Sequence, residues 1–122
     1  MNVNASELTV NGVVYVPKSD VTEMAVKQGE QRVIVRTYSA GVFAGYIKER
    51  NGQEVTLKFA RRLWRWSGAA SLSQLAADGT SSPSECKFPC EVQEILLLNA
   101  IEIIPITERA SKSIDGVAIW EV

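Results

Sequence analysis

The chain has 122 residues, of which 46% are hydrophobic and 22% charged, which fits one globular domain with a hydrophobic core. No apolar run approaches the roughly 20 residues of a membrane-spanning helix. The chain also begins without the basic-then-apolar pattern of a secretory signal, so a cytoplasmic location is expected. Because it contains no histidine, the usual Ser-His-Asp and Cys-His arrangements and most catalytic zinc sites are excluded. We expect no catalytic centre, no metal site and no cofactor.

The net charge of −1 hides an asymmetry along the chain. Residues 32–65 carry eight basic and two acidic side chains, a net charge of +6, whereas the remainder carries −7. Long nucleic acid usually binds a broadly basic domain. A basic segment within an acidic remainder therefore favours a compact anion as ligand. The other interpretation is that the two sets of charges pair with each other across the surface.

The elements predicted along the chain indicate a single α+β domain, an antiparallel sheet meander with a few short helices. Its N-terminal part, 1–30, contains a predicted hairpin and a short helix. Its main part, 31–122, contains the sheet and a C-terminal helix. No internal repeat divides the chain.

The N-terminal hairpin is predicted over 8–16, because Asn11-Gly12 is the strongest two-residue hairpin signal. Asp20 and Glu23 stand at the spacing of a capping box, and a glycine follows six residues later. This pattern predicts a short helix over 20–28.

Three strands of a meander are predicted over 32–38, 42–50 and 54–66. The first alternates between two faces, as a strand does. Asn51-Gly52 predicts a tight hairpin turn between the second and third strands.

The second half of the chain continues the α+β pattern. Ser71 and Gln74 have capping-box spacing, and Thr107 is placed to cap a later helix. The expected elements are a helix at 72–78, strands at 92–98 and 101–104, a helix at 107–115 and a closing strand at 117–122.

The segment 61–71 carries the strongest functional signal. Arginine forks suit phosphate, indole faces stack on nucleobases, and a small-residue turn before a helix offers backbone N–H groups to an anion. The other interpretation is a strand with buried tryptophans and solvated arginines. The candidate ligand contacts are Arg61, Arg62, Trp64, Trp66, Ser67 and Ser71, with Phe88 as a further stacking surface.

Because side chains alternate between the two faces of a strand, these residues should divide between two faces, unless a bulge interrupts the alternation. Arg62, Trp64 and Trp66 would share one face. Arg61 and Arg65 would then lie on the other.

Two further groups could complete a nucleotide site. Arg36, Tyr38 and Ser39 offer a guanidinium, a phenol and a hydroxyl from a predicted strand end. Arg109 and Lys112 lie three residues apart on a predicted helix and so share a face. The plainer interpretations are a half-exposed strand and a solvated helix face.

Cys86 and Cys90 are the only cysteines. Two thiolates without histidine cannot complete a four-ligand zinc site within one chain. A disulfide is possible, but a reducing cytosol disfavours it. We interpret both as small packing residues.

Several segments resemble a set of small bacteriophage proteins, namely 33–45, 66–76, 86–90 and 101–105. The resemblance spans about residues 31–114. Within this set of phage proteins, the chain resembles the phage Thoeris anti-defence sponges. It implies a homo-oligomer that sequesters, without cleaving, a cyclic ADP-ribose signal made by bacterial TIR enzymes, or a cyclic oligonucleotide, in the cytoplasm of an infected bacterium. It implies no membrane and no long nucleic acid as partners.

Two other functions stay open at this point. One is a small phage or prophage accessory module that binds nucleic acid or a host protein. The other, less favoured, is a nucleotide-cleaving enzyme built on a Lys, Tyr, Cys or carboxylate centre.

Overall fold

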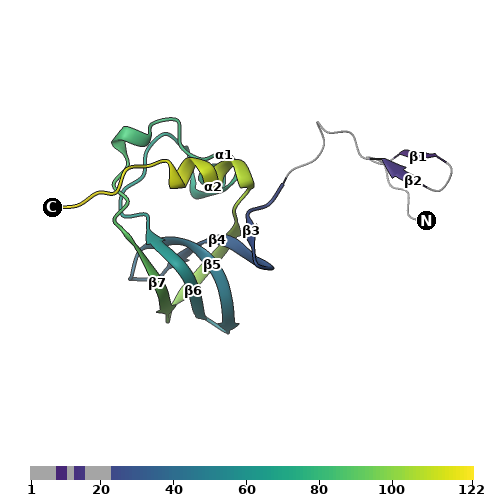
Figure 1. Ribbon diagram of the computed structural model, residues 1–122. Helices are drawn as coiled ribbons and strands as arrows, with labels where there is room; N and C mark the ends of the chain where they lie inside the picture. The colour runs from purple at the N-terminus through teal and green to yellow at the C-terminus, as the bar shows by residue number, and fades with distance from the viewer. Residues whose placement is uncertain (1–7, 11–12, 16–22) are drawn as a thin grey trace.

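The computed structural model describes residues 8–10, 13–15 and 23–122 (Figure 1). The first two of these segments are strands β1 (Leu8–Val10) and β2 (Val13–Tyr15), which pair antiparallel. Val10 lies opposite Val13, so the predicted hairpin is confirmed. Its turn, Asn11-Gly12, falls outside the described residues.

The remaining strands form one six-stranded antiparallel sheet. They are β3 (Val26–Lys27), β4 (Glu30–Thr37), β5 (Val42–Asn51), β6 (Glu54–Arg62), β7 (Glu91–Leu97) and β8 (Ala100–Pro105). Strands β3 to β7 follow one another in chain order as a meander, and β8 returns to pair with β4. With the helices α1 (Leu72–Asp78) and α2 (Glu108–Asp115), this confirms the predicted α+β class.

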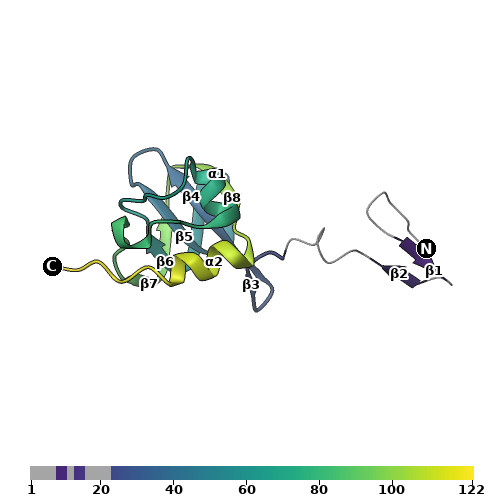
Figure 2. The ribbon, with the colours of Figure 1, turned by 90° about the horizontal axis from the view of Figure 1, so that it is seen from above.

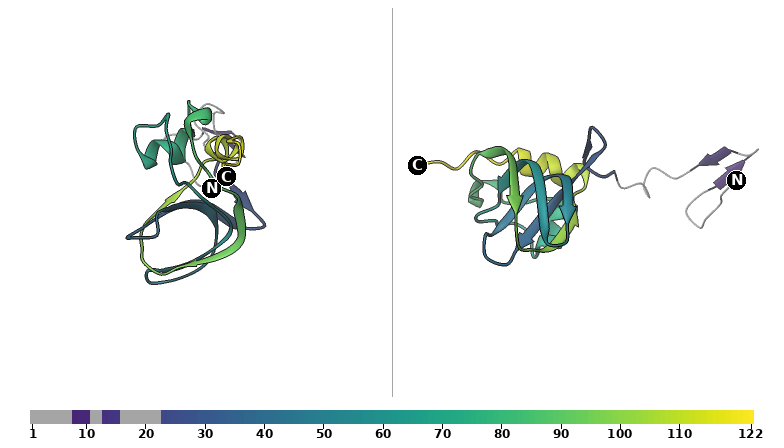
Figure 3. Two further views of the ribbon diagram at one scale, coloured as in Figure 1. Left: turned by 90° about the vertical axis from the view of Figure 1, so that its left-hand side faces the viewer. Right: turned by 90° about the horizontal axis from the view of Figure 1, so that it is seen from below.

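The sheet curls into an open barrel, which the end-on view of Figure 3 shows as a ring. Strands β7 and β8 lie at opposite ends of the order β8-β4-β5-β6-β7. Only Leu98 and Asn99 separate them along the chain, so the two ends of the sheet must approach each other. The N–H of Ala100 donates to the carbonyl of Gln53 at 3.0 Å, which ties the start of β8 to the β5–β6 turn.

The middle of strand β4 is buried on both faces, which explains its apolar run of Val33, Ile34 and Val35. Val33 and Val35 point to one side and Ile34 to the other, as the pleat requires. The valine side faces a cluster supplied by all five barrel strands. Its buried members are Val33, Val35, Phe43, Val55, Leu57, Ala60, Leu97 and Ala100.

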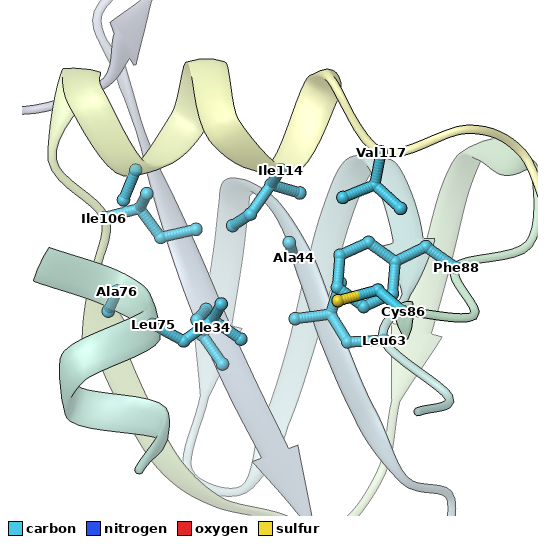
Figure 4. Packing of buried hydrophobic residues seen from close by; sticks show 11 residues of the cluster. Ile34, Ala44, Leu63, Leu75, Ala76, Cys86, Phe88, Ile106, Ile114 and Val117 are labelled. Atoms are coloured by element: carbon cyan, nitrogen blue, oxygen red, sulfur yellow. The ribbon is translucent and has the colours of Figure 1, made fainter. Parts of the chain in front are cut away.

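A second core lies between the outside of the barrel and the two helices (Figure 4). Both helices cover this same side of the sheet (Figures 1 and 2). The members of this helix-side core are Ile34, Ala44, Leu63, Leu75, Ala76, Cys86, Phe88, Ile106, Ala110, Ile114 and Val117. It fixes the chain that leaves β6 and the chain that leaves α2 against the same layer.

Both helices begin at the predicted caps. The hydroxyl of Ser71 accepts the N–H of Gln74 at 3.2 Å, and the hydroxyl of Thr107 accepts the N–H of Ala110 at 3.1 Å. Each bond satisfies one of the unpaired N–H groups of a first turn. The predicted helices at 72–78 and 107–115 are thus confirmed.

The helix predicted over 20–28 is wrong for residues 23–28, and residues 20–22 lie outside the described part of the chain. Instead, this segment forms main-chain hydrogen bonds with distant residues and includes the short strand β3. Ala25 donates its N–H to Ile106 at 2.9 Å and accepts the N–H of Arg32 at 2.7 Å. Gln28 and Gly29 have φ of 53° and 77°, the two positive values of a type I′ hairpin turn. The glycine is therefore a hairpin residue and not a helix stop.

Two other parts of the chain differ from expectation, the turn between β5 and β6 and the segment 117–122. Asn51 pairs with Glu54, so the two-residue loop of that hairpin is Gly52-Gln53, one residue later than predicted. Gly52, at φ 62°, takes the first loop position, where a type II′ turn needs glycine. The closing strand predicted at 117–122 is also wrong, because this segment makes only a single bridge, between Ile119 and Phe88.

Candidate functional site

A bulge in β6 decides where the arginines of segment 61–71 point. The β5–β6 register shifts between Ala44 and Tyr46, and Phe59 has a positive φ of 51°. After the bulge Arg61 faces the helix-side core. Arg62 lies over the ring of Phe43, with its guanidinium carbon 4.6 Å from the ring centroid.

Arg61 is a structural anchor, 6% exposed. Its guanidinium donates to four main-chain carbonyls, of Phe88 (3.1 Å), Pro89 (3.0 Å), Ile114 (2.9 Å) and Val117 (2.8 Å). Two of these acceptors lie at the end of α2, where a cation is favourable. Burial lowers the pKa of Arg61, an effect that the coulombic influence of Asp115 opposes.

Two of the predicted ligand contacts therefore belong to the core. Arg61 has its donors turned to carbonyls within the protein, and Phe88 is fully buried beneath that guanidinium. Neither presents a surface on which a ligand from solvent could settle. In the sequence these two residues looked like ligand contacts, but in the structure both pack within the protein.

The chain beyond β6 forms an exposed aromatic site. Arg65 and Lys87 exchange main-chain hydrogen bonds of 3.2 and 2.7 Å, and the N–H of Trp120 donates to the Phe88 carbonyl at 2.9 Å. Three distant segments thus lie side by side. The indoles of Trp64 and Trp120 stack at 4.9 Å between centroids, with only 4° between their planes.

We call this region the tryptophan corner; it consists of Trp64, Arg65, Trp66, Lys87 and Trp120. A hollow of about 440 Å³, within the range of small-molecule sites, opens at its side. The hollow is lined by Arg65, Trp66, Ser67, Ser84, Glu85 and Lys87. It therefore offers two cations, one carboxylate, two hydroxyls and one indole to a ligand.

Trp64 and Trp66 do not play equal parts in the corner. The regular alternation of β6 ends at Arg62, so strand parity no longer groups these two indoles as predicted. Trp64 is 57% exposed, whereas Trp66 is partly buried against the helix-side core. Trp64 is thus the surface on which a flat group could stack.

In the small-residue turn before α1, several hydroxyl and N–H groups already form hydrogen bonds within the protein. The hydroxyl of Ser71 caps α1, and the N–H of Ala70 donates to the side chain of Gln74 at 2.7 Å. The hydroxyl of Ser67 donates to Glu85 at 3.3 Å. Ser67 lines the hollow. The Ser71 hydroxyl and the Ala70 N–H, which were predicted to bind phosphate at this helix start, bind groups of the protein instead.

Arg36, Tyr38 and Ser39 belong to another part of the surface, at the end of β4. Arg36 pairs with Glu102 of β8 at 3.4 Å, and the N–H of Tyr38 donates to the carbonyl of Asn99. All three are exposed, and Tyr38 is 81% exposed. The structure therefore does not bring this group to the tryptophan corner.

Arg109 and Lys112 lie on the exposed side of α2. Arg109 forms an ion pair with Asp78 at the end of α1, so it links the two helices. Neither residue lines the hollow of the corner. Within one copy of the chain they are surface groups.

Sequence reasoning missed Lys87 and Trp120. Trp120 fell in the predicted closing strand, and Lys87 sits between Cys86 and Phe88 without a motif of its own. Only the pairing of 65 with 87 and of 88 with 119 brings them to Trp64.

The two cysteines differ in their surroundings. Both are free; Cys86 is buried in the helix-side core, as predicted, whereas Cys90 is exposed and the packing interpretation is wrong for it. Cys90 directly follows Pro89, whose carbonyl Arg61 binds.

In the part of the chain that the structure describes, no helix is long and apolar enough to cross a membrane. Across 8–10, 13–15 and 23–122 no group of three or more Cys, Asp or Glu is placed to hold a metal ion.

Comparison with known proteins gives one match. Neither the curated proteins nor the solved structures contain a matching chain. A family model described as a domain of unknown function, DUF6948, matches residues 30–114, which run from the start of β4 into the last turn of α2 and include Trp64 and Lys87. The chain belongs to the DUF6948 family.

Proposed function

We propose that this protein binds a compact nucleotide signal of the cyclic ADP-ribose type and holds it without cleaving it. The observation that carries the proposal is the exposed indole of Trp64 beside Lys87, Arg65 and an open hollow. An indole face stacks on an adenine, and the two cations suit a pyrophosphate. Ser67 and Glu85 offer hydrogen bonds of the kind that ribose hydroxyls accept and donate.

The distribution of ion pairs supports the corner as the anion site. Much of the basic segment is neutralised internally. Arg32 pairs with Asp115 at 2.9 Å, Lys48 with Glu94 at 2.9 Å, Lys58 with Glu30 at 3.0 Å, and Arg36 with Glu102 at 3.4 Å. Among the described residues Arg50, Arg62, Arg65 and Lys87 have no carboxylate within ion-pair distance, and of these four Arg65 and Lys87 line the hollow. Their charge is thus available to a ligand.

Sequestration, as opposed to turnover, is supported by composition and by resemblance. A chain without histidine lacks the usual proton-transfer group, and a sponge works by stoichiometry alone. The similarity of segments such as 66–76 and 86–90 to phage Thoeris anti-defence sponges fits this role. These two segments contribute Trp66 and Lys87 to the corner, and Ser67 to the lining of its hollow.

Replacing Trp64 or Lys87 with alanine tests the proposal. We expect Trp64→Ala to weaken binding of cyclic ADP-ribose by about 1–3 kcal/mol, the range for one stacked base. Lys87→Ala removes a charge-assisted hydrogen bond and is expected to cost about 1.5–3 kcal/mol. Isothermal titration with each variant gives both values.

Arg109→Ala is the matched control for charge, because it removes one exposed cation outside the corner. Its affinity for cyclic ADP-ribose should equal that of the wild type. If the Trp64 and Lys87 variants also bind as the wild type does, the corner is not the ligand site.

A homo-oligomer is the second part of the proposal. Large apolar side chains stay exposed on and around β7 and β8, among them Val92, Leu96, Leu98 and Ile101. Apolar surface of this kind is commonly covered by another copy of a chain. Light scattering at micromolar concentration should give a multiple of 13.4 kDa, and the mass of one chain would contradict the expectation.

A further inference from the structure

The segment after α2 holds Trp120 against Trp64. Its main chain is fixed by the bridge between Ile119 and Phe88 and by the 2.9 Å hydrogen bond from Trp120 to the Phe88 carbonyl. Phe88 is itself fully buried and lies under Arg61. The main chain that carries the Trp120 indole is thus tied to a fully buried residue of the helix-side core.

The position of Lys87 shows which surface of the stack stays open. Its ammonium nitrogen lies 5.7 Å from the centroid of Trp64 and 5.5 Å from that of Trp120, and the two centroids are 4.9 Å apart. These three distances form a nearly equilateral triangle. The ammonium therefore lies beside the stack, and it does not cover the outer face of either indole.

Trp64 offers the more open indole. It is 57% exposed although Trp120 covers one of its faces, whereas Trp120 is 36% exposed. A base that stacks on the outer face of Trp64 would lie one layer beyond the Lys87 ammonium, and a phosphate joined to that base could reach the ammonium past the edge of the Trp64 indole. The stack and the cation thus place an aromatic face and a positive charge next to each other, as a base and its phosphate would need.

We infer that Trp120 is a positioning residue, which holds the Trp64 indole flat and ready for a nucleobase. This inference rests on the proposed function. An unsupported Trp64 side chain would have to be immobilised when the ligand binds, and that cost lowers affinity. Trp120 orders the indole beforehand, through a stack that aromatic pairs favour. The family match ends at residue 114, so the tail that supplies Trp120 lies outside the matched region.

The experiment uses the full chain, with cyclic ADP-ribose as the probe, and compares Trp120→Ala with Trp120→Phe. Because one side chain loses its preorganisation, Trp120→Ala should bind about 3- to 10-fold more weakly. Trp120→Phe keeps an aromatic face and should recover most of that loss. Circular dichroism should show an exciton couplet of the two indoles in the wild type and none in either variant.

The outcomes separate the two proposals. If the wild type binds and Trp120→Ala binds equally well or more tightly, Trp120 does not position Trp64 and the inference is overturned, while the proposed function stands. If Trp120→Phe binds as weakly as Trp120→Ala, the effect is not one of stacking, which also contradicts the inference. If the wild type itself does not bind the probe, the proposed function fails and the inference fails with it.

Discussion

Phe88→Ala should lower the free energy of unfolding by about 3–5 kcal/mol, the cost of truncating a buried aromatic side chain. Phe88 is 0% exposed and packs in the helix-side core with Leu63, Ile114 and Val117. Figure 4 shows its ring between Leu63 and Val117. Its loss would leave a cavity where the chain after β6, the loop before β7 and the end of α2 meet.

Equilibrium unfolding in urea measures this effect. Cys90→Ala is a suitable control, because Cys90 lies two residues away and is exposed; it should change stability by no more than about 0.5 kcal/mol. A Phe88→Ala protein as stable as the wild type would mean that this ring does not pack as described.

Arg61→Ala should be almost as damaging, at about 3 kcal/mol or more. The substitution leaves the carbonyls of Phe88, Pro89, Ile114 and Val117 without their shared donor, and each buried unsatisfied group is costly. Arg61→Lys should rescue little of this loss, because an ammonium cannot reproduce the fork that reaches four acceptors. Both variants are compared by the urea midpoint and its slope.

Arg62→Ala provides the neighbouring control. Arg62 is exposed, and its one aromatic contact, over Phe43, is worth about 0.5–1 kcal/mol. A larger loss at position 62 than at position 61 would reverse the assignment of anchor and surface arginine.

Much of the fold follows from local sequence signals. Ser71 and Thr107 cap helices at the predicted places because capping depends on residues a few positions apart. The alternation of Val33, Ile34 and Val35 predicts a strand for the same reason. The segment 23–28 could not be predicted in this way, since Ala25 is held by Ile106, a residue far along the chain.

The candidate site was predictable only in part. Local chemistry marked the segment that contains Trp64, Trp66 and Ser67, and the structure places these residues in or beside the corner. It could not separate Arg61 from ligand-facing arginines, because the bulge at Phe59 and the carbonyls that Arg61 binds depend on tertiary structure. Lys87 and Trp120 reach the corner only through pairing of distant segments.

We propose that the protein retains its nucleotide ligand intact. The most direct test mixes the protein with excess cyclic ADP-ribose, removes free ligand, releases the bound fraction by heat and identifies it by chromatography. We predict cyclic ADP-ribose in fixed stoichiometry with the chain, and an affinity in the nanomolar range, about −12 kcal/mol. Accumulation of a linear product over many turnovers, or no retained ligand at all, would contradict the proposed function.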